Sequence, residues 1–101
     1  MDKDAAFKIA KTFVEFLKVK KYQIVDAYLF GSYAKGNFNE DSDIDLAIIL
    51  EGCKNNYDTQ VDLMKLRRNF DLRIEPHPFE KSDIDGNDPF LSEVLKTGIK
   101  I

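Results

Sequence analysis

Two aspartates, Asp43 and Asp45, stand two residues apart where an acidic loop runs into an apolar stretch, within YLFGSYAKGNFNEDSDIDLAIIL (residues 28–50). Side chains two residues apart on a strand point to the same side of the sheet, so the two carboxylates would project together. Neighbouring carboxylates repel each other, and a cation between them relieves that repulsion. Proteins bind Mg²⁺ through one or two carboxylates together with substrate phosphates. The pair therefore predicts a magnesium site that faces a phosphate-bearing substrate.

A third carboxylate at a matching depth would allow two metal ions and the activation of an attacking hydroxyl. The stretch FDLRIEP (residues 70–76) offers two candidates, Asp71 and Glu75. At the period of two typical of a strand, both would share one face with Arg73, which could balance their charge. Either acid could reach Asp43 and Asp45, depending on the strand register.

Gly31 and Ser32 interrupt the chain about ten residues before the aspartate pair. Glycine permits a tight turn and a close approach of the backbone, and the N–H groups of such a turn, with the serine hydroxyl, can hold a phosphate oxygen. Gly36 provides a second bend. A Gly-Ser pair alone is usually only a turn, and a D-x-D at a strand start is usually surface charge. Their combination with a buried strand predicts a nucleotide site.

Two kinds of element would position these residues. Helical spacing of apolar residues predicts helices over residues 4–20, 57–69 and 89–97, and runs of β-branched and aromatic residues predict strands over residues 23–30, 43–50 and 70–76. The strand over 43–50 is expected to be buried on both faces, and the strand over 70–76 is expected to end at Pro76 and Pro78.

The helices carry recognisable faces and ends. The first would begin near Asp2 or Asp4, and the last would have Asp88 as N-cap, Pro89 in its first turn and Gly98 at its end. The residues expected to face the core are Ala6, Ile9, Ala10, Phe13, Phe16 and Leu17 in the first helix and Val61, Met64 and Leu66 in the second.

The order α-β-β-α-β-α predicts an α+β fold. The first two strands, joined by a short turn region, are expected to be antiparallel, and the third follows a helical crossover. A small mixed sheet with flanking helices results. The chain of 101 residues suits one domain, expected to span residues 1–101.

Composition narrows the classes of function. Apolar residues make up 44% of the chain and charged residues 33%, as in globular proteins, and a net charge of −3 gives no support for a general nucleic-acid binder. The single cysteine, Cys53, allows no internal disulfide and is expected to be inert. No apolar run approaches the roughly 18 residues of a membrane span. Without a signal-peptide pattern, a soluble, cytoplasmic protein is expected.

The segment GSYAKGNFNEDSDIDLAII (residues 31–49) resembles the nucleotidyltransferase signature of the DNA polymerase β superfamily, in which G-S is followed after about ten residues by D-x-D on a strand. The segments RIEPHPF and PFLSEVLKTGIKI are similar to those of minimal, MNT-type nucleotidyltransferases. The resemblance covers nearly the whole chain. It implies a nucleotidyltransferase fold like the polymerase β palm, Mg²⁺ as cofactor and an NTP as substrate.

Residue by residue, the resemblance assigns Gly31 and Ser32 to the phosphate-binding turn and Asp43 and Asp45 to the metal. The third acid in the family is flanked by apolar residues on the next strand, a pattern that fits both Glu75 and Asp71. Glu75 is favoured as catalytic and metal-binding residue, and Asp71 remains the alternative. Lys35 is a candidate triphosphate contact, although a solvated loop lysine is an equal alternative.

Many proteins of this kind are antitoxins paired with a HEPN-domain RNase toxin, which they adenylylate. The resemblance thus implies transfer of AMP from ATP to a hydroxyl of a HEPN partner protein. Two alternatives are a binding partner that neutralises a HEPN protein by contact alone and a small-molecule nucleotidyltransferase. The intact Ser32, Asp43 and Asp45 argue for activity, and the lack of a second domain argues against a small-molecule acceptor.

The remaining polar and aromatic residues near the motif carry weaker indications. His77 could be a catalytic base, but the prolines on both sides favour a structural role in an extended turn. Tyr28 and Phe30 are expected in the core. Tyr33 and Phe38 are left open between packing and stacking on the adenine base.

Overall fold

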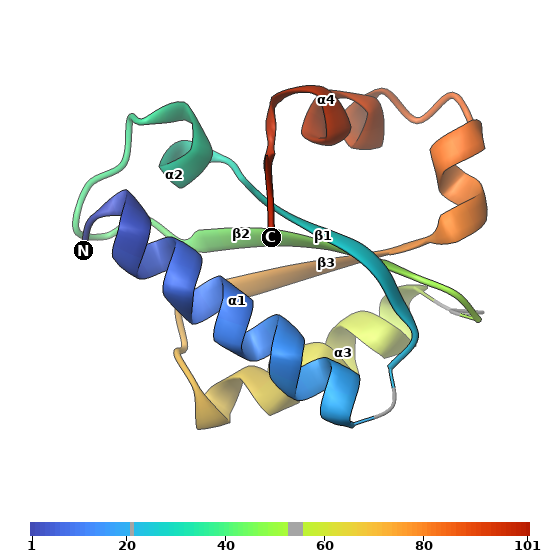
Figure 1. Ribbon diagram of the computed structural model, residues 1–101, viewed down its shortest axis with the longest axis horizontal. Helices are drawn as coiled ribbons and strands as arrows, with labels where there is room; N and C mark the ends of the chain where they lie inside the picture. The colour runs from blue at the N-terminus through green and yellow to red at the C-terminus, as the bar shows by residue number, and fades with distance from the viewer. Residues whose placement is uncertain (21, 53–55) are drawn as a thin grey trace.

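The computed structural model describes residues 1–20, 22–52 and 56–101. Its centre is a four-stranded sheet with the order β3-β2-β1-β4. The strands are β1 (Ile24–Phe30), β2 (Ile44–Leu50), β3 (Ile74–Glu80) and β4 (Ile99–Lys100). The helices are α1 (Lys3–Val19), α2 (Ser32–Lys35), α3 (Asn56–Leu66) and α4 (Pro89–Thr97), with 3₁₀ turns η1 (Arg67–Asn69) and η2 (Lys81–Asp85). Helices α1 and α3 lie on one side of the sheet, and α4 lies on the other (Figure 1).

The strand directions are those expected from the sequence. β1 pairs with β2 in antiparallel fashion, and β2 pairs with β3 in parallel after the crossover through α3. The predicted α+β fold with a small mixed sheet is thereby confirmed. The sequence pattern does not predict β4, which pairs Lys100 with Tyr28 and Ile99 with Leu29. A strand of two residues offers no period to detect, and only its partner β1 makes it a strand.

The core lies between the sheet and α1. Asp2 caps α1 by accepting a hydrogen bond from the Ala5 N–H over 2.8 Å, and Asp4 follows in the first turn, as predicted. The buried face of α1 comprises Ala6, Ala10, Phe13, Val14 and Leu17, whereas Ile9 and Phe16 are partly buried at its margin. In β2 every residue is buried except Asp45, which is partly accessible. β2 is therefore buried on both faces, as expected.

The third strand differs from its prediction. It runs over Ile74–Glu80 rather than residues 70–76, and Pro76 and Pro78 lie within it instead of ending it. β3 is an edge strand, and proline is tolerated there because its missing N–H can face away from the neighbouring strand. Pro76 and Pro78 are buried on the same face as Ile74, which leaves Glu75 and His77 on the opposite face.

The second predicted helix also differs in part. α3 ends at Leu66, and residues 67–69 continue as a 3₁₀ turn. Leu63 is its buried residue, whereas Val61, expected in the core, is exposed. Met64 and Leu66 are partly buried.

The last helix begins and ends as predicted. Asp88 accepts hydrogen bonds from the N–H groups of Phe90 and Leu91, Pro89 opens the helix, and Gly98 follows its last residue. Cys53 lies outside the described residues. Within the described part of the chain, no helix combines the length and the apolar character needed to cross a membrane.

Candidate active site

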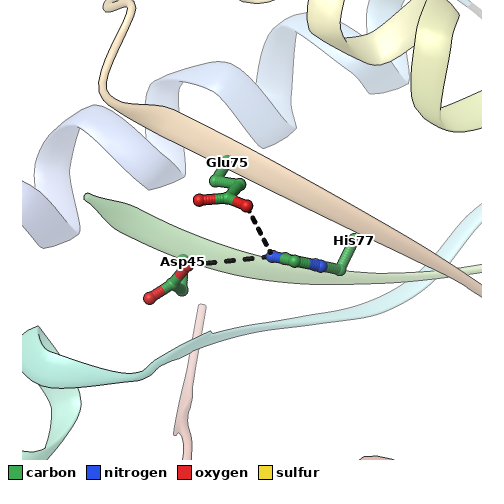
Figure 2. A group of neighbouring side chains, drawn as sticks. All are labelled: Asp45, Glu75 and His77. Carbon is green, nitrogen blue, oxygen red and sulfur yellow. Dashed lines mark ion pairs between the residues drawn. The ribbon is translucent and has the colours of Figure 1, made fainter.

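The strand register brings two carboxylates together. Asp45 lies in the second position of β2, directly opposite Glu75 in the second position of β3. Both side chains are partly exposed on the face of the sheet turned away from α1 (Figure 2). Asp43 is exposed, stands one residue before β2, and lies close enough to Glu75 for its carboxylate to raise the pKa of Glu75. The three predicted acids therefore meet at one end of the β2–β3 pair.

Asp71, the alternative third acid, occupies a different position. It precedes β3, and its two carboxylate oxygens accept hydrogen bonds from Nε and Nη2 of Arg73 over 2.9 Å and 2.7 Å. The hydrogen bonds and the charge of Arg73 hold the pKa of Asp71 below its ordinary range. The prediction that Asp71, Arg73 and Glu75 share one strand face is wrong, because β3 begins only at Ile74. The register thus places Glu75, and not Asp71, opposite Asp45.

Electrostatics at the site favour a bound cation. Burial raises the pKa of Glu75 above its ordinary range, and the carboxylates of Asp45 and Asp43 raise it further, while His77 acts in the opposite direction. A raised carboxyl pKa means that the negative charge is poorly compensated by the protein alone. A divalent cation would supply the missing compensation.

Gly31 brings the backbone into contact with this cluster. Its φ of +74° is unfavourable for residues with a side chain, and a Cβ atom at this position would overlap the carboxylate of Asp45. Gly31 is also the N-cap of α2, which begins at Ser32. At the other end of this single turn, the Ser32 carbonyl accepts hydrogen bonds from the N–H groups of Gly36 and Asn37. The predicted Gly-Ser turn is therefore the start of a short helix that adjoins the carboxylates.

A cavity of about 330 Å³ lies beside the turn. Its lining includes Phe30 and Gly31 from the end of β1, Lys35 from α2, and Phe90 and Glu93 from α4. Lys35 is exposed, so its ammonium group is free to approach an anionic ligand in this cavity. Gly31 thus adjoins both the carboxylate of Asp45 and the cavity that Lys35 also lines.

The family model described as "Polymerase beta, Nucleotidyltransferase" matches residues 11–101. The chain belongs to this family. The matched residues include the carboxylate cluster and the adjoining glycine turn.

Two individual proteins resemble this nucleotidyltransferase. One, from Methanocaldococcus jannaschii, is named "Putative protein adenylyltransferase MJ0604" and is 49% identical over 43 residues, which are 42% of this chain and 43% of that protein. The match therefore spans less than half the length of the relative. The other is a crystal structure of "a putative nucleotidyltransferase from Sulfolobus solfataricus", which superimposes with a TM-score of 0.64 at 24% identity over 82% of this chain and 74% of the other. The similarity to the Sulfolobus solfataricus structure shows that the two proteins share a fold.

The candidate site also contains His77, for which the sequence favours a structural role in an extended turn. His77 follows Glu75 on the same face of β3, and its Nε2 lies 3.7 Å from Asp45 Oδ1 and 3.9 Å from Glu75 Oε1. The expectation of an extended structural turn is wrong, because His77 is a strand residue. The signal available in the sequence was the same period of two that links Asp43 with Asp45.

The aromatic residues divide between the site and the core. Phe30 is half-buried on the site face, where its ring contacts His77 at a centroid distance of 5.2 Å and Phe90 at 5.5 Å. Tyr28 is likewise only partly buried, so the expectation that these two residues belong to the core is wrong. Tyr33 is fully buried and stacks on Phe38 at 4.7 Å, which favours packing for this pair.

Proposed function

We propose that this nucleotidyltransferase transfers AMP from ATP to a hydroxyl group of a partner protein with Mg²⁺ as cofactor. The observation that carries the proposal is the pairing of Asp45 with Glu75 across two parallel strands, with Gly31 packed against the Asp45 carboxylate. The name of the Methanocaldococcus jannaschii relative, a protein adenylyltransferase, supports a protein acceptor, and the match includes less than half of that protein.

The residues present fit a magnesium site. Carboxylate oxygens are the hard ligands that Mg²⁺ takes, and the raised pKa of Glu75 reflects negative charge that lacks compensation. Asp43, Asp45 and Glu75 would hold the metal. Bound there, Mg²⁺ supplies charge compensation for the triphosphate and lowers the pKa of the acceptor hydroxyl.

The chemistry is an in-line displacement. The acceptor oxygen forms a bond to the α-phosphorus of ATP, the bond from that phosphorus to the bridging oxygen breaks, pyrophosphate leaves, and the hydroxyl proton is released. Gly31 and Ser32 would hold the phosphates against the carboxylates, and Lys35 would face the leaving pyrophosphate from the cavity wall. Positioning and electrostatics supply most of the rate enhancement in such transfers.

The partner that we propose is a HEPN-domain RNase toxin, with this protein as its antitoxin in the cytoplasm. The support is the chain's similarity to minimal nucleotidyltransferases. The cavity beside the turn is lined by residues of β1, α2 and α4, and we expect the folded partner to present its hydroxyl there. Neutralisation by contact alone is the competing function, and it differs in requiring neither ATP nor Mg²⁺.

Label transfer tests this function. Purified protein is incubated with a candidate HEPN protein, Mg²⁺ and ATP labelled at either the α- or the γ-phosphate, alongside the variants Asp43→Asn and Asp45→Asn. Asp41→Asn is the matched control, because Asp41 is an exposed loop acid whose loss changes the net charge equally.

The expected result is label on the partner from α-labelled ATP only, lost in Asp43→Asn and Asp45→Asn and retained in Asp41→Asn, with all variants folded by circular dichroism. Full transfer by Asp45→Asn would refute the assigned site. A tight complex that inhibits the partner without ATP, and without label from either nucleotide, would establish neutralisation by contact instead.

A further inference from the structure

His77 is held in a fixed position beside Asp45 and Glu75. β3 pairs His77 with Ala47 of β2, whose small side chain leaves space for the imidazole ring to lie across the neighbouring strand (Figure 2). The ring of Phe30 contacts the imidazole edge to face at 5.2 Å, and that of Phe90 lies 6.3 Å away. These contacts orient Nε2 toward the two carboxylates rather than toward solvent.

The Nε2 atom lacks the partner that such an atom normally has. It is buried and makes no hydrogen bond within the described residues. Its nearest acids, Asp45 Oδ1 at 3.7 Å and Glu75 Oε1 at 3.9 Å, lie beyond hydrogen-bonding distance. A buried polar atom without a partner is costly, and a ligand bound by Nε2 and both carboxylates would supply that partner.

The spacing suits a single cation. One oxygen of Asp45, one oxygen of Glu75 and one nitrogen of His77 all lie within 4.8 Å of one another. Ligands that share a cation at bond lengths of about 2.1 Å lie about 3 Å apart, so small side-chain rotations close the site. Three ligands from one side leave the remaining positions open to substrate oxygens.

We propose that His77 is a metal ligand and that Asp45, Glu75 and His77 form a mixed carboxylate–imidazole site that selects Mn²⁺ over Mg²⁺. Imidazole nitrogen is a good ligand for first-row transition metals, whereas Mg²⁺ takes oxygen ligands and surrenders its water reluctantly. Asp43 lies outside this group of three. With Asp45, it would hold the Mg²⁺ of the proposed function as a second cation beside the nucleotide. A role of this metal in catalysis rests on the proposed nucleotidyl transfer. The proposal that these three residues bind a metal does not depend on that function.

Direct ligation is measurable because His77 is the single histidine of the chain. Untagged protein with ¹⁵N-labelled histidine is titrated with ¹¹³Cd²⁺, and the imidazole nitrogens are observed by NMR. A scalar coupling between cadmium and Nε2 arises only through a bond. We expect this coupling in the wild type and in Asp71→Asn, and its loss in Asp45→Asn and Glu75→Gln.

Metal preference is measured in parallel. Binding of Mn²⁺ is followed by the disappearance of its free EPR signal, and Mg²⁺ is assayed by competition. His77→Gln, checked for folding by thermal unfolding, should weaken Mn²⁺ binding about tenfold or more and leave Mg²⁺ binding nearly unchanged. Asp43→Asn should retain the coupling to Nε2.

Two results would overturn the inference: no bound cadmium coupled to Nε2, or an unchanged ratio of Mn²⁺ to Mg²⁺ affinity in His77→Gln. The failures of the two proposals are distinguishable. If cadmium couples to Nε2 but no metal supports label transfer, the proposed nucleotidyl transfer is refuted and the metal site remains supported. If label transfer is faster with Mg²⁺ and cadmium does not couple to Nε2, the proposed function remains supported and the role of His77 as a metal ligand is refuted.

Discussion

The carboxylate of Asp45 lies directly against the α-carbon of Gly31, in the space that a Cβ atom would occupy. Gly31 directly follows β1 and Asp45 lies near the start of β2, and the antiparallel pairing of Phe30 with Asp45 brings them together. This contact joins the turn predicted to bind phosphate to the residue predicted to bind metal.

Gly31→Ala should therefore impair transfer beyond any effect on stability. The methyl group displaces the Asp45 carboxylate, and a shift of about 1 Å in a catalytic group can cost about 100-fold in rate. Gly36→Ala is the matched control, because Gly36 also has a positive φ, +84°, but a Cβ added there would meet no atom within 4 Å. Gly36→Ala should lose about 1–2 kcal/mol of stability, measured by chemical denaturation. Gly31→Ala should lose more, because its backbone (φ +74°, ψ −149°) lies outside the left-handed helical region and its Cβ overlaps the Asp45 carboxylate. Equal label transfer by the two variants would contradict a role for the contact.

Glu75→Gln and Asp71→Asn should separate the two candidate third carboxylates. Because Glu75 pairs with Asp45 and Asp71 is bound by Arg73, Glu75→Gln should lower label transfer at least about 100-fold, and Asp71→Asn should leave it within about threefold of wild type. The measurement is the initial rate of transfer at saturating ATP. The reverse pattern would assign the third metal-binding position to Asp71.

Asp71 should instead contribute to stability in a pH-dependent way. Hydrogen bonds from Arg73 lower the pKa of folded Asp71 below its ordinary value of 3.8, so the folded state favours the charged form. The resulting stabilisation is complete above the unfolded pKa and is lost as the pH falls through the folded pKa. Thermal unfolding should show Asp71→Asn less stable than wild type at pH 7, with the difference shrinking in acid. A difference that grows on acidification would contradict the ion pair.

Lys35→Ala should weaken ATP binding without affecting the fold. The exposed ammonium group lines the cavity next to Gly31, where it can approach a triphosphate. We expect KM for ATP to rise several-fold, the increase being smaller at high ionic strength because salt screens exposed charges. Lys96→Ala serves as control, since Lys96 is an exposed lysine that lines a different cavity. Identical KM values would show that Lys35 is only a solvated lysine.

The sequence by itself determined the local features of this protein. Helical spacing, the Asp2 and Asp88 caps and the apolar run of β2 located most elements, and the Gly31-Ser32 and Asp43-x-Asp45 motifs located the site. These signals are local, because periodicity and capping depend on residues within a few positions of one another.

The tertiary structure decided which distant residues meet. Which of Asp71 and Glu75 lies opposite Asp45 depended on where β3 begins. Pro76 and Pro78 argued against a strand at these positions, because a sheet accepts proline mainly in an edge strand, and only the order of the strands shows that β3 is at the edge. The membership of His77 in the site depended on the parallel register that sets it beside Ala47. Register is fixed by the packing of whole strands against the core, so a single segment does not encode it.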